Sequence, residues 1–246
     1  MDHFKKVLSR TRQAMQQYHM IDAGDTVAVG VSSGKDSLTL LLALSRLRRF
    51  YPVPFSLLAV TLDMGIKGEE HGDVAAFCRE EDVPYHVIPT DIYKIVFEER
   101  HEKNPCALCS RIRRRLLCDA AAALGAGKLA LGHHMDDAAE TAMMNLIFGG
   151  EWRCFEPMTT YEDSGITLIR PLILTPEKEI RATAKDCNLP VKKSLCPEDH
   201  NTERENIKAL LRDLEYQYPG VKHRILGALK KSDAANWQPP IEKEKP

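Results

Sequence analysis

The stretch that decides the fold is DTVAVGV (Asp25–Val31), followed directly by SSGKDS (Ser32–Ser37). The short, apolar and β-branched first part predicts a buried strand. From Asp36 to Phe50 the apolar residues lie along one side, which predicts a helix. The small residues between them predict a tight turn from strand to helix.

The rest of the chain repeats this alternation. Strands are expected at 56–62, 85–88, 128–131 and 166–169, with helices at 69–82, 111–125, 136–148 and 177–187. Residues 91–103 are expected to be helical or irregular. The alternation predicts an α/β fold, a doubly wound parallel sheet of about five strands with right-handed crossovers. An amphipathic helix over 3–19 precedes it, and helices broken near Pro219-Gly220 follow over 202–231.

Composition excludes several classes of protein. The 246 residues are 43% hydrophobic, 28% charged and 7% aromatic, unlike a disordered, collagen-like or coiled-coil chain. A formal net charge of −1 excludes a uniformly basic nucleic-acid coat, but not a local basic patch. The N-terminus does not read as a secretory signal, and the most apolar stretches, 38–44 and 120–131, are too short to cross a membrane. We therefore expect a cytoplasmic protein with no membrane partner.

The loop Ser32–Ser37 follows the first strand, where ligands of parallel sheets bind. Small residues let the backbone approach an anion, the three serines offer hydroxyls, and Lys35 offers a charge. The loop is therefore a candidate phosphate site. It is not a Walker A loop, because Val29 and Asp36 replace residues which that motif requires. The alternative is an ordinary helix start capped by Ser33 or Asp36.

Seven cysteines, an odd number, make a disulfide framework improbable and point to a metal, a cluster or redox chemistry. Cys106 and Cys109 have CxxC spacing, which suits one metal or cluster, a redox dithiol, or a plain surface pair. A third ligand would come from the remaining cysteines. Cys196 is modestly favoured because it precedes a proline in a loop.

Six basic residues and one acid lie between Arg100 and Arg115. This density suits tRNA phosphates or an anionic cluster, and the alternative is a solvated helix face.

Two further strand ends carry polar residues. GHHMDDAAET (132–141) contains a glycine that permits close approach and two acids that begin a helix. Capping explains the acids, and a metal site of two His and two Asp is the alternative. Asp63-Met64-Gly65 is either a plain turn or a wall of a nucleotide site.

The loop Ser32–Ser37 resembles the SGGxDS pyrophosphate-binding loop of the PP-loop ATP pyrophosphatases, with Ser33 in place of the first glycine. The segments PCxLCxRxRR and GHHxDDxxET and a late cysteine resemble, within them, the tRNA 2-thiocytidine synthetase (TtcA) family. The likeness, which runs from about Asp22 to Leu229, implies a HUP-like fold with a PP-loop ATP-binding domain (22–190) and a C-terminal helical segment (191–236). The sequence pattern adds an N-terminal helix (1–21) and a Pro- and charge-rich tail (237–246) that is expected to be disordered.

The resemblance also implies site residues. Cys106, Cys109 and Cys196 match the three thiolates that hold a 4Fe-4S cluster in that family and leave one iron open. Asp136, Arg113 and Lys35 match positions with catalytic roles, Asp136 positioning Mg²⁺ or the activated base. The positions expected to bind ATP, which include Lys35 again, are Ser32, Ser33, Gly34, Lys35, Asp36, Ser37, Asp63, Met64 and Gly132.

The implied activity is ATP-dependent thiolation of a tRNA pyrimidine, with ATP cleaved to AMP and pyrophosphate, and the family likeness favours cytidine in the anticodon loop. Arg111, Arg114 and Arg115 would bind the tRNA. A sulfur donor such as a cysteine desulfurase and a homodimer are also implied. The alternatives are a 2-thiouridine synthetase or another PP-loop ligase, and, in a different class, a non-catalytic ATP-binding or iron–sulfur sensor module.

Overall fold

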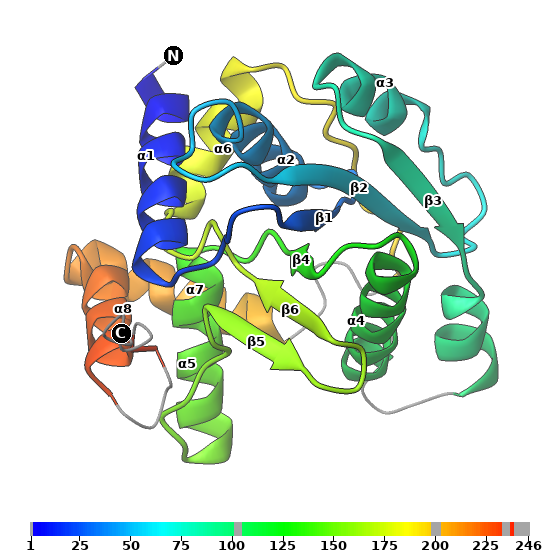
Figure 1. Ribbon diagram of the computed structural model, residues 1–246. Coiled ribbons are helices and arrows are strands. Elements are labelled where there is room, and N and C mark those ends of the chain that lie inside the picture. The colour runs from blue at the N-terminus through cyan, green and yellow to red at the C-terminus, as the bar shows by residue number, and fades with distance from the viewer. Residues whose placement is uncertain (1, 101–104, 198–202, 233–236, 239–246) are drawn as a thin grey trace.

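A six-stranded sheet with helices on both faces forms the centre of the computed structural model, which describes residues 2–100, 105–197, 203–232 and 237–238 (Figure 1). The strand order is β3-β2-β1-β4-β6-β5. The strands are β1 (Thr26–Gly30), β2 (Ser56–Asp63), β3 (Tyr85–Pro89), β4 (Lys128–Ala130), β5 (Met158–Tyr161) and β6 (Ile166–Ile169).

The first five strands in this order are parallel, as the alternating pattern predicts, so the α/β fold class is confirmed. Strand β1 pairs with β2 on one side and with β4 on the other. Strands β2 and β3 therefore lie on one side of β1, and strands β4, β6 and β5 lie on its other side. The carboxyl ends of β1 and β4 flank the point where the strand order reverses, which is where such sheets bind ligands.

Strand β5 is an element that the sequence pattern did not predict. It pairs antiparallel with β6 at the edge of the sheet, and Gly165, with φ +66°, lies in the turn between them. An edge strand buries little apolar surface, and the sequence of β5, MTTY, accordingly is short and has no run of apolar residues. The expectation of about five strands thus holds for the parallel part of the sheet, and the hairpin adds the sixth.

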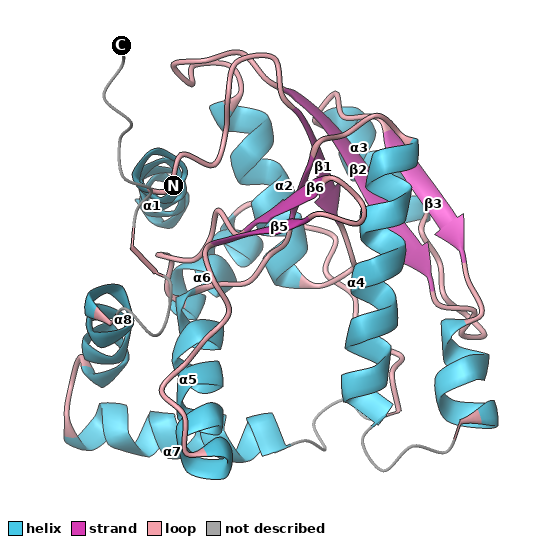
Figure 2. Ribbon diagram, turned by 60° about the horizontal axis from the view of Figure 1, so that its bottom comes forward, coloured by secondary structure: helices cyan, strands magenta, loops and turns pink. Residues whose placement is uncertain are grey.

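Alternate residues of each strand face different cores. In β1, Val27 and Val29 belong to the core on one face of the sheet, while Ala28 belongs to the core on the other face. The first core is covered by α1 (Asp2–Gln17), α2 (Lys35–Leu47), α3 (Gly72–Glu80) and α6 (Glu177–Asp186). The second core is covered by α4 (Pro105–Ala123), which crosses the sheet in Figure 2, and receives Val96 from η1 (Lys94–Glu99), a π-helix.

Three further helices lie together beside the sheet: α5 (Met135–Gly149), α7 (Glu203–Gln217) and α8 (Val221–Lys231). Helices α7 and α8 both pack against α5 and against each other. Gly220, with φ +86°, separates α7 from α8, so the predicted break near Pro219-Gly220 is confirmed. This arrangement brings the C-terminal segment onto the helix that follows β4.

The prediction of a disordered tail from residue 237 onward is wrong at its first residue. Trp237 is fully buried in the first core, and its indole N–H donates to the carbonyl oxygen of Phe155 at 2.8 Å. Burial of the large indole ring holds Trp237 in the core, even though the residues that follow it are rich in proline. Residues 239–246 lie outside the described part of the chain. Among the described helices, none is long and apolar enough to span a bilayer.

Candidate functional site

The loop Ser32–Ser37 is held in shape by its own serines. The Ser37 hydroxyl donates to the carbonyl oxygens of Ser32 (2.9 Å) and Gly34 (3.1 Å), and it accepts from the Ser32 backbone N–H at 3.0 Å. The Ser32 hydroxyl accepts from the Gly34 N–H at 3.2 Å. These bonds order the loop around the first turn of α2, where backbone N–H groups favour an anion.

Ser33 fits this loop without backbone strain. Among the described non-glycine residues, positive φ occurs at His19, Asp82 and Asn188, and Ser33 is not one of them. The position therefore does not require glycine. The carbonyl oxygen of Ser33 accepts the backbone N–H of Lys192 at 2.9 Å, so the segment after α6 docks directly onto the loop.

Lys35 is engaged by two carboxylates. Its Nζ lies 3.0 Å from Asp36 Oδ2 and 2.9 Å from Glu177 Oε1. Burial lowers the pKa of Lys35, but the negative charges of Asp36 and Glu177 outweigh that effect and the pKa is raised. Lys35 is therefore a charged ammonium group at the phosphate loop.

The loop after β4 packs onto the phosphate loop. A Cβ on Gly132 would lie 3.0 Å from the backbone of Asp36 and Ser37, so only glycine allows this approach. His134 and Asp137 then cap α5 reciprocally. The His134 N–H donates to Asp137 Oδ2 at 2.9 Å, and His134 Nδ1 accepts the Asp137 N–H at 3.4 Å. The acids of this segment thus begin the helix, as the capping interpretation expects.

Asp136 is buried with both carboxylate oxygens occupied. Oδ1 accepts from Lys222 Nζ at 2.7 Å, and Oδ2 accepts from the Glu177 backbone N–H at 2.7 Å, which caps the first turn of α6. Lys222 lies in the first turn of α8, so a residue of the C-terminal segment supplies the cation beside Asp136. Arg113 is exposed on α4. Within the described residues, the cation bonded to Asp136 is Lys222 rather than Arg113.

Mg²⁺ prefers free carboxylate oxygens, and Asp136 does not offer one in this arrangement. Asp36 does, because its Oδ1 is buried without a hydrogen-bond partner in the described part of the chain and lies 3.6 Å from His134 Nε2. Of the two residues, Asp36 fits a magnesium ligand better.

A buried polar cluster lies behind the site on α5. Arg204, from α7, lies 3.4 Å from Asp137 Oδ1, 3.5 Å from Glu140 Oε2 and 3.2 Å from the Thr141 hydroxyl. Burial raises the pKa of Glu140 to about 7, and burial lowers the pKa of His133 to about 4. The contacts fasten α7 to the helix that carries Asp136.

Asp63, Met64 and Gly65 form an ordered turn after β2. Asp63 Oδ1 accepts the Gly65 N–H at 2.9 Å, and Glu69 accepts the Met64 N–H at 3.0 Å. Ligand atoms of Asp63, Glu69 and His71 lie within 4.8 Å of one another. The turn lies at the carboxyl end of β2, which pairs with β1, and both interpretations of the sequence, a plain turn and a wall of a nucleotide site, are compatible with this position.

The cysteine pair lies on the first turn of α4. The sequence predicts this helix from Arg111, but it begins at Pro105, because proline is well suited to the first helical position. Cys106, Cys109 and Arg113 therefore share one helical face at spacings of three and four residues. Since α4 runs antiparallel to the parallel strands, this turn lies at their carboxyl edge.

Cys196 lies within electrostatic range of this pair. Burial raises the pKa of Cys109, Arg113 opposes the rise, and the Cys196 and Cys106 thiols raise it further. This influence places the three thiols in the same part of the molecule, although among the described residues their sulfurs do not all lie within 4.8 Å of one another. The Cys196 backbone N–H donates to Ser194 Oγ at 3.1 Å, which orders the loop that presents it.

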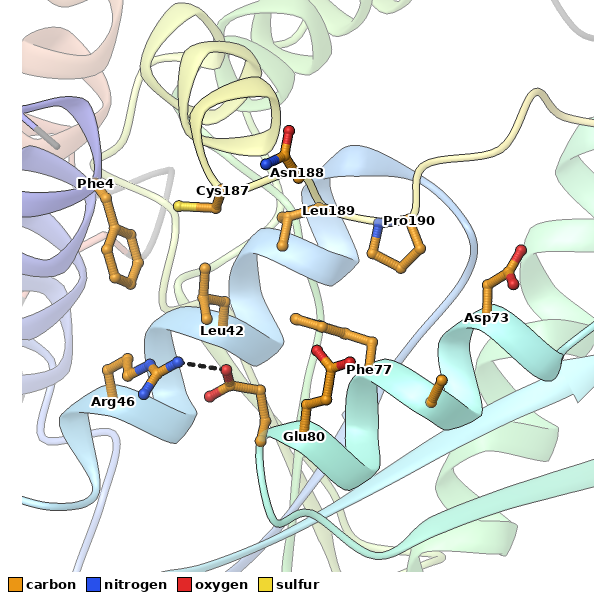
Figure 3. Close-up of a pocket in the computed structure, with 12 residues that line it drawn as sticks. Phe4, Leu42, Arg46, Asp73, Phe77, Glu80, Cys187, Asn188, Leu189 and Pro190 are labelled. Atoms are coloured by element: carbon orange, nitrogen blue, oxygen red, sulfur yellow. Dashed lines mark hydrogen bonds and ion pairs between the residues drawn. The ribbon is translucent and has the colours of Figure 1, made fainter.

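The other cysteines lie elsewhere. Cys78 and Cys118 are buried in the two cores, and Cys154 donates to the Ala138 carbonyl oxygen at 3.4 Å. Cys187 ends α6 and lines a pocket of about 480 Å³ together with Phe4 and Leu42 (Figure 3). That pocket lies against the C-terminal half of α2, at the opposite end of this helix from the loop Ser32–Ser37.

The arginines of α4 are exposed and unequally available. Arg115 lies 3.1 Å from Asp119 and 3.9 Å from Asp163, whereas Arg114 contacts the Tyr161 hydroxyl at 3.4 Å. Arg111 is also exposed. Residues 101–104, part of the basic segment identified in the sequence, lie outside the described residues.

Four residues of the site come from outside the motifs: Glu177, Arg204, Lys208 and Lys222. Arg204 and Lys208 lie in a downstream run that resembles the family's C-terminal segment, but the run does not indicate what they contact, and Glu177 and Lys222 have no such signal. The four come from α6, α7 and α8 and reach the nucleotide loop and α5 only through the tertiary packing. The position of Glu177 directly after a proline predicts a helix start, and nothing local predicts that its side chain contacts Lys35.

Comparison with known proteins adds independent findings. Residues 5–217 match the PP-loop domain. A tRNA-cytidine(32) 2-sulfurtransferase of Geobacter sulfurreducens is 38% identical over 229 residues, covering 92% of this chain and 89% of that protein. The protein of the same description from Cupriavidus necator is 37% identical over 227 residues, covering 92% of this chain and 72% of its own.

Among solved structures, a second kind of tRNA thiolase is also similar to this chain. The U34-tRNA thiolase NcsA from Methanococcus maripaludis, solved with its 4Fe-4S cluster, superposes with a TM-score of 0.75 at 27% identity, covering 92% of this chain and 77% of that one. The NH3-dependent NAD synthetase of Campylobacter jejuni, at 17% identity and a TM-score of 0.50, shares the fold alone.

Proposed function

This chain belongs to the PP-loop proteins, in the family of the tRNA-cytidine(32) 2-sulfurtransferases, and from that premise we propose that it uses ATP to thiolate C2 of a cytidine in tRNA. One observation carries the proposal. The segment that presents Cys196 to the cysteine pair also donates the Lys192 N–H to Ser33 of the phosphate loop. The residue that contacts the proposed nucleotide loop and the proposed third cluster ligand thus lie on one stretch of five residues, 192–196.

The reaction balances as two displacements at the nucleotide site. The C2 oxygen of the cytidine bonds to the α-phosphate of ATP and pyrophosphate leaves. Sulfur then bonds to C2 and the oxygen departs with AMP. Lys35 and the N–H groups of the loop stabilise the phosphate charge that develops in the first displacement. Asp136, held by Lys222 and by the first turn of α6, is fixed to position the activated base.

Two thiols on the first turn of α4 and a third on the segment after α6, close enough to influence the pKa of Cys109, support a cluster held by three thiolates. Cys106, Cys109 and Cys196 would hold it, and when bound it supplies the iron site that carries sulfur. Arg113, one turn beyond Cys109, places a positive charge beside the thiols and favours their ionised form. The proposal also includes Mg²⁺ at Asp36, a sulfur donor such as a cysteine desulfurase, and a homodimer.

The tRNA would approach the exposed arginines of α4. Arg111 and Arg114 are the stronger candidates for phosphate contacts, because Arg115 is already shared between two aspartates. The target base must leave its stack to reach a site at the sheet edge.

The deciding experiment is a reaction reconstituted without oxygen. The protein, with iron, ATP, a sulfur source and tRNA from cells that lack the modification, should yield 2-thiocytidine by nucleoside mass spectrometry and release pyrophosphate. Lys35→Ala should reduce pyrophosphate release about 100-fold or more while remaining folded, because a loop charge contributes little to the core.

Two outcomes contradict the proposal. Formation of 2-thiouridine in place of 2-thiocytidine would assign the chain to the enzymes that modify uridine. NcsA, which this chain resembles in structure, is a U34-tRNA thiolase. Absence of pyrophosphate release with any tRNA would favour a nucleotide-binding or iron–sulfur sensor module.

A further inference from the structure

Three cations surround one carboxylate oxygen at the nucleotide loop. Glu177 Oε1 lies 2.9 Å from Lys35 Nζ, 3.1 Å from Arg181 Nη2 and 3.5 Å from Lys208 Nζ. The glutamate side chain is only 10% exposed, whereas that of Lys208 is 29% exposed. The three cations come from α2, α6 and α7, so the cluster is assembled by the tertiary fold.

Such a set of cations is the environment that a phosphate oxygen requires. Burial raises the pKa of Glu177, but Lys35 and then Lys208 outweigh it and bring the pKa down to about 2. The carboxylate is therefore a permanent anion. Lys35 belongs to the loop that is built to receive phosphates, and a carboxylate oxygen and a phosphate oxygen are acceptors of the same kind.

We propose that Glu177 holds the place of a phosphate in the nucleotide-free protein, and that Lys208 becomes a ligand of the pyrophosphate portion of bound ATP. The inference rests on the nucleotide site of the proposed function and extends it to the C-terminal helices. When phosphate oxygens enter, Lys35 and Lys208 turn from the carboxylate to them. Helix α7, which Arg204 fastens to α5, thereby completes a site that begins in the loop after β1.

Binding of inorganic pyrophosphate to the full chain, measured by calorimetry in the presence of a chelator, tests Lys208. Lys208→Ala should weaken pyrophosphate binding about tenfold, the loss expected for one charged hydrogen bond. Lys208→Arg should recover most of it. Affinity for AMP, which lacks the pyrophosphate, should stay within twofold. Arg212→Ala, an exposed cation one turn further along α7, is the matched control and should leave both affinities unchanged.

The competing role of Glu177 has its own test. Glu177→Gln removes the internal anion and keeps the shape of the side chain, so pyrophosphate should bind several-fold more tightly. Weaker binding by a folded Glu177→Gln variant would show that the glutamate supports the site instead of competing for it. Unchanged binding by Lys208→Ala would remove Lys208 from the site, even if Glu177→Gln fails to fold.

These results are separable from the reaction itself. If pyrophosphate binding follows the expected pattern but no thionucleoside forms, the phosphate site stands and the sulfur-transfer proposal fails. If thiolation proceeds while Lys208→Ala binds pyrophosphate normally, the opposite conclusion holds.

Discussion

Ser33 shows how a single residue can depart from a motif without changing the loop. Because its backbone is not in the left-handed region, a serine there is unstrained, and its contact with the rest of the protein is through the carbonyl oxygen. Ser33→Gly should therefore keep ATP-dependent pyrophosphate release within about twofold. It should lower the free energy of unfolding by roughly 0.5–1 kcal/mol, since glycine loses more freedom on folding. Denaturant melts and turnover measured on the same preparation check both. A severe loss of turnover would assign the hydroxyl a function.

Glu140 makes the stability of the protein depend on pH. Its pKa is about 7 in the folded chain against an ordinary value of 4.5, with burial as the main cause. Between these values the folded state holds a proton that the unfolded state has released, so the free energy of unfolding falls as pH rises from 4.5 to 7. Glu140→Gln removes this dependence.

The variant should therefore gain stability relative to the parent protein as pH rises, by on the order of 2 kcal/mol between pH 4.5 and pH 8. His133, with its pKa lowered to about 4, acts in the opposite sense between pH 4 and pH 6.5, but it is present in both proteins and cancels in the difference. Urea unfolding of both proteins across this range measures the quantity. A difference that does not change with pH would mean that folding does not raise the pKa of Glu140.

At the scale of elements, the proposed cluster would join the α4 N-terminus to the 192–196 segment through Cys106, Cys109 and Cys196. Removing any one of three thiolates opens a second iron, so Cys196→Ser should lose iron and thiolation together. It should keep ATP affinity within about twofold, because Lys192 contacts the phosphate loop through its backbone. Iron analysis, thionucleoside yield and nucleotide titration, all without oxygen, are the measurements.

Cys187→Ser is the matched control for this experiment. Cys187 ends α6 and lies among charged neighbours that include Arg46 and Glu81, away from the cysteine pair. The control variant should retain iron, thiolation and ATP affinity. An essential Cys187 beside a dispensable Cys196 would mean that the third ligand is misassigned.

Elements whose residues carry a local pattern could be predicted, and elements defined by distant partners could not. The parallel strands were predictable because β1 and β2 are buried on both faces and read as apolar runs. The edge strand β5 buries little and gives no such run. The phosphate loop and CxxC pair are contiguous in sequence, whereas Lys222 reaches Asp136 across 86 positions. Only the packing of α8 on α5 creates that contact.

At the scale of the whole molecule, the core is closed by a residue near the end of the chain. Trp237 shares the first core with Leu226 and Leu229 of α8, and its indole N–H donates to Phe155 before β5. One side chain thus joins the C-terminal segment to the segment between α5 and the sheet edge. Composition does not predict this role, because Trp237 is followed by QPPIEKEKP, a Pro- and charge-rich sequence that is typical of a disordered tail.

Three changes to this region should therefore have graded effects on the free energy of unfolding. Trp237→Ala leaves a cavity and should lower it by about 3–5 kcal/mol. Trp237→Phe keeps most of the ring but leaves the Phe155 carbonyl oxygen without its donor, and should lower it by about 1–3 kcal/mol. Deleting residues 239–246, for which the sequence predicts no fixed structure, should change it by less than about 0.5 kcal/mol. Denaturant unfolding followed by circular dichroism ranks all three. If the deletion destabilised the protein as much as Trp237→Ala, the final residues would have to pack on the core as well, and the boundary of the folded chain would move to its end.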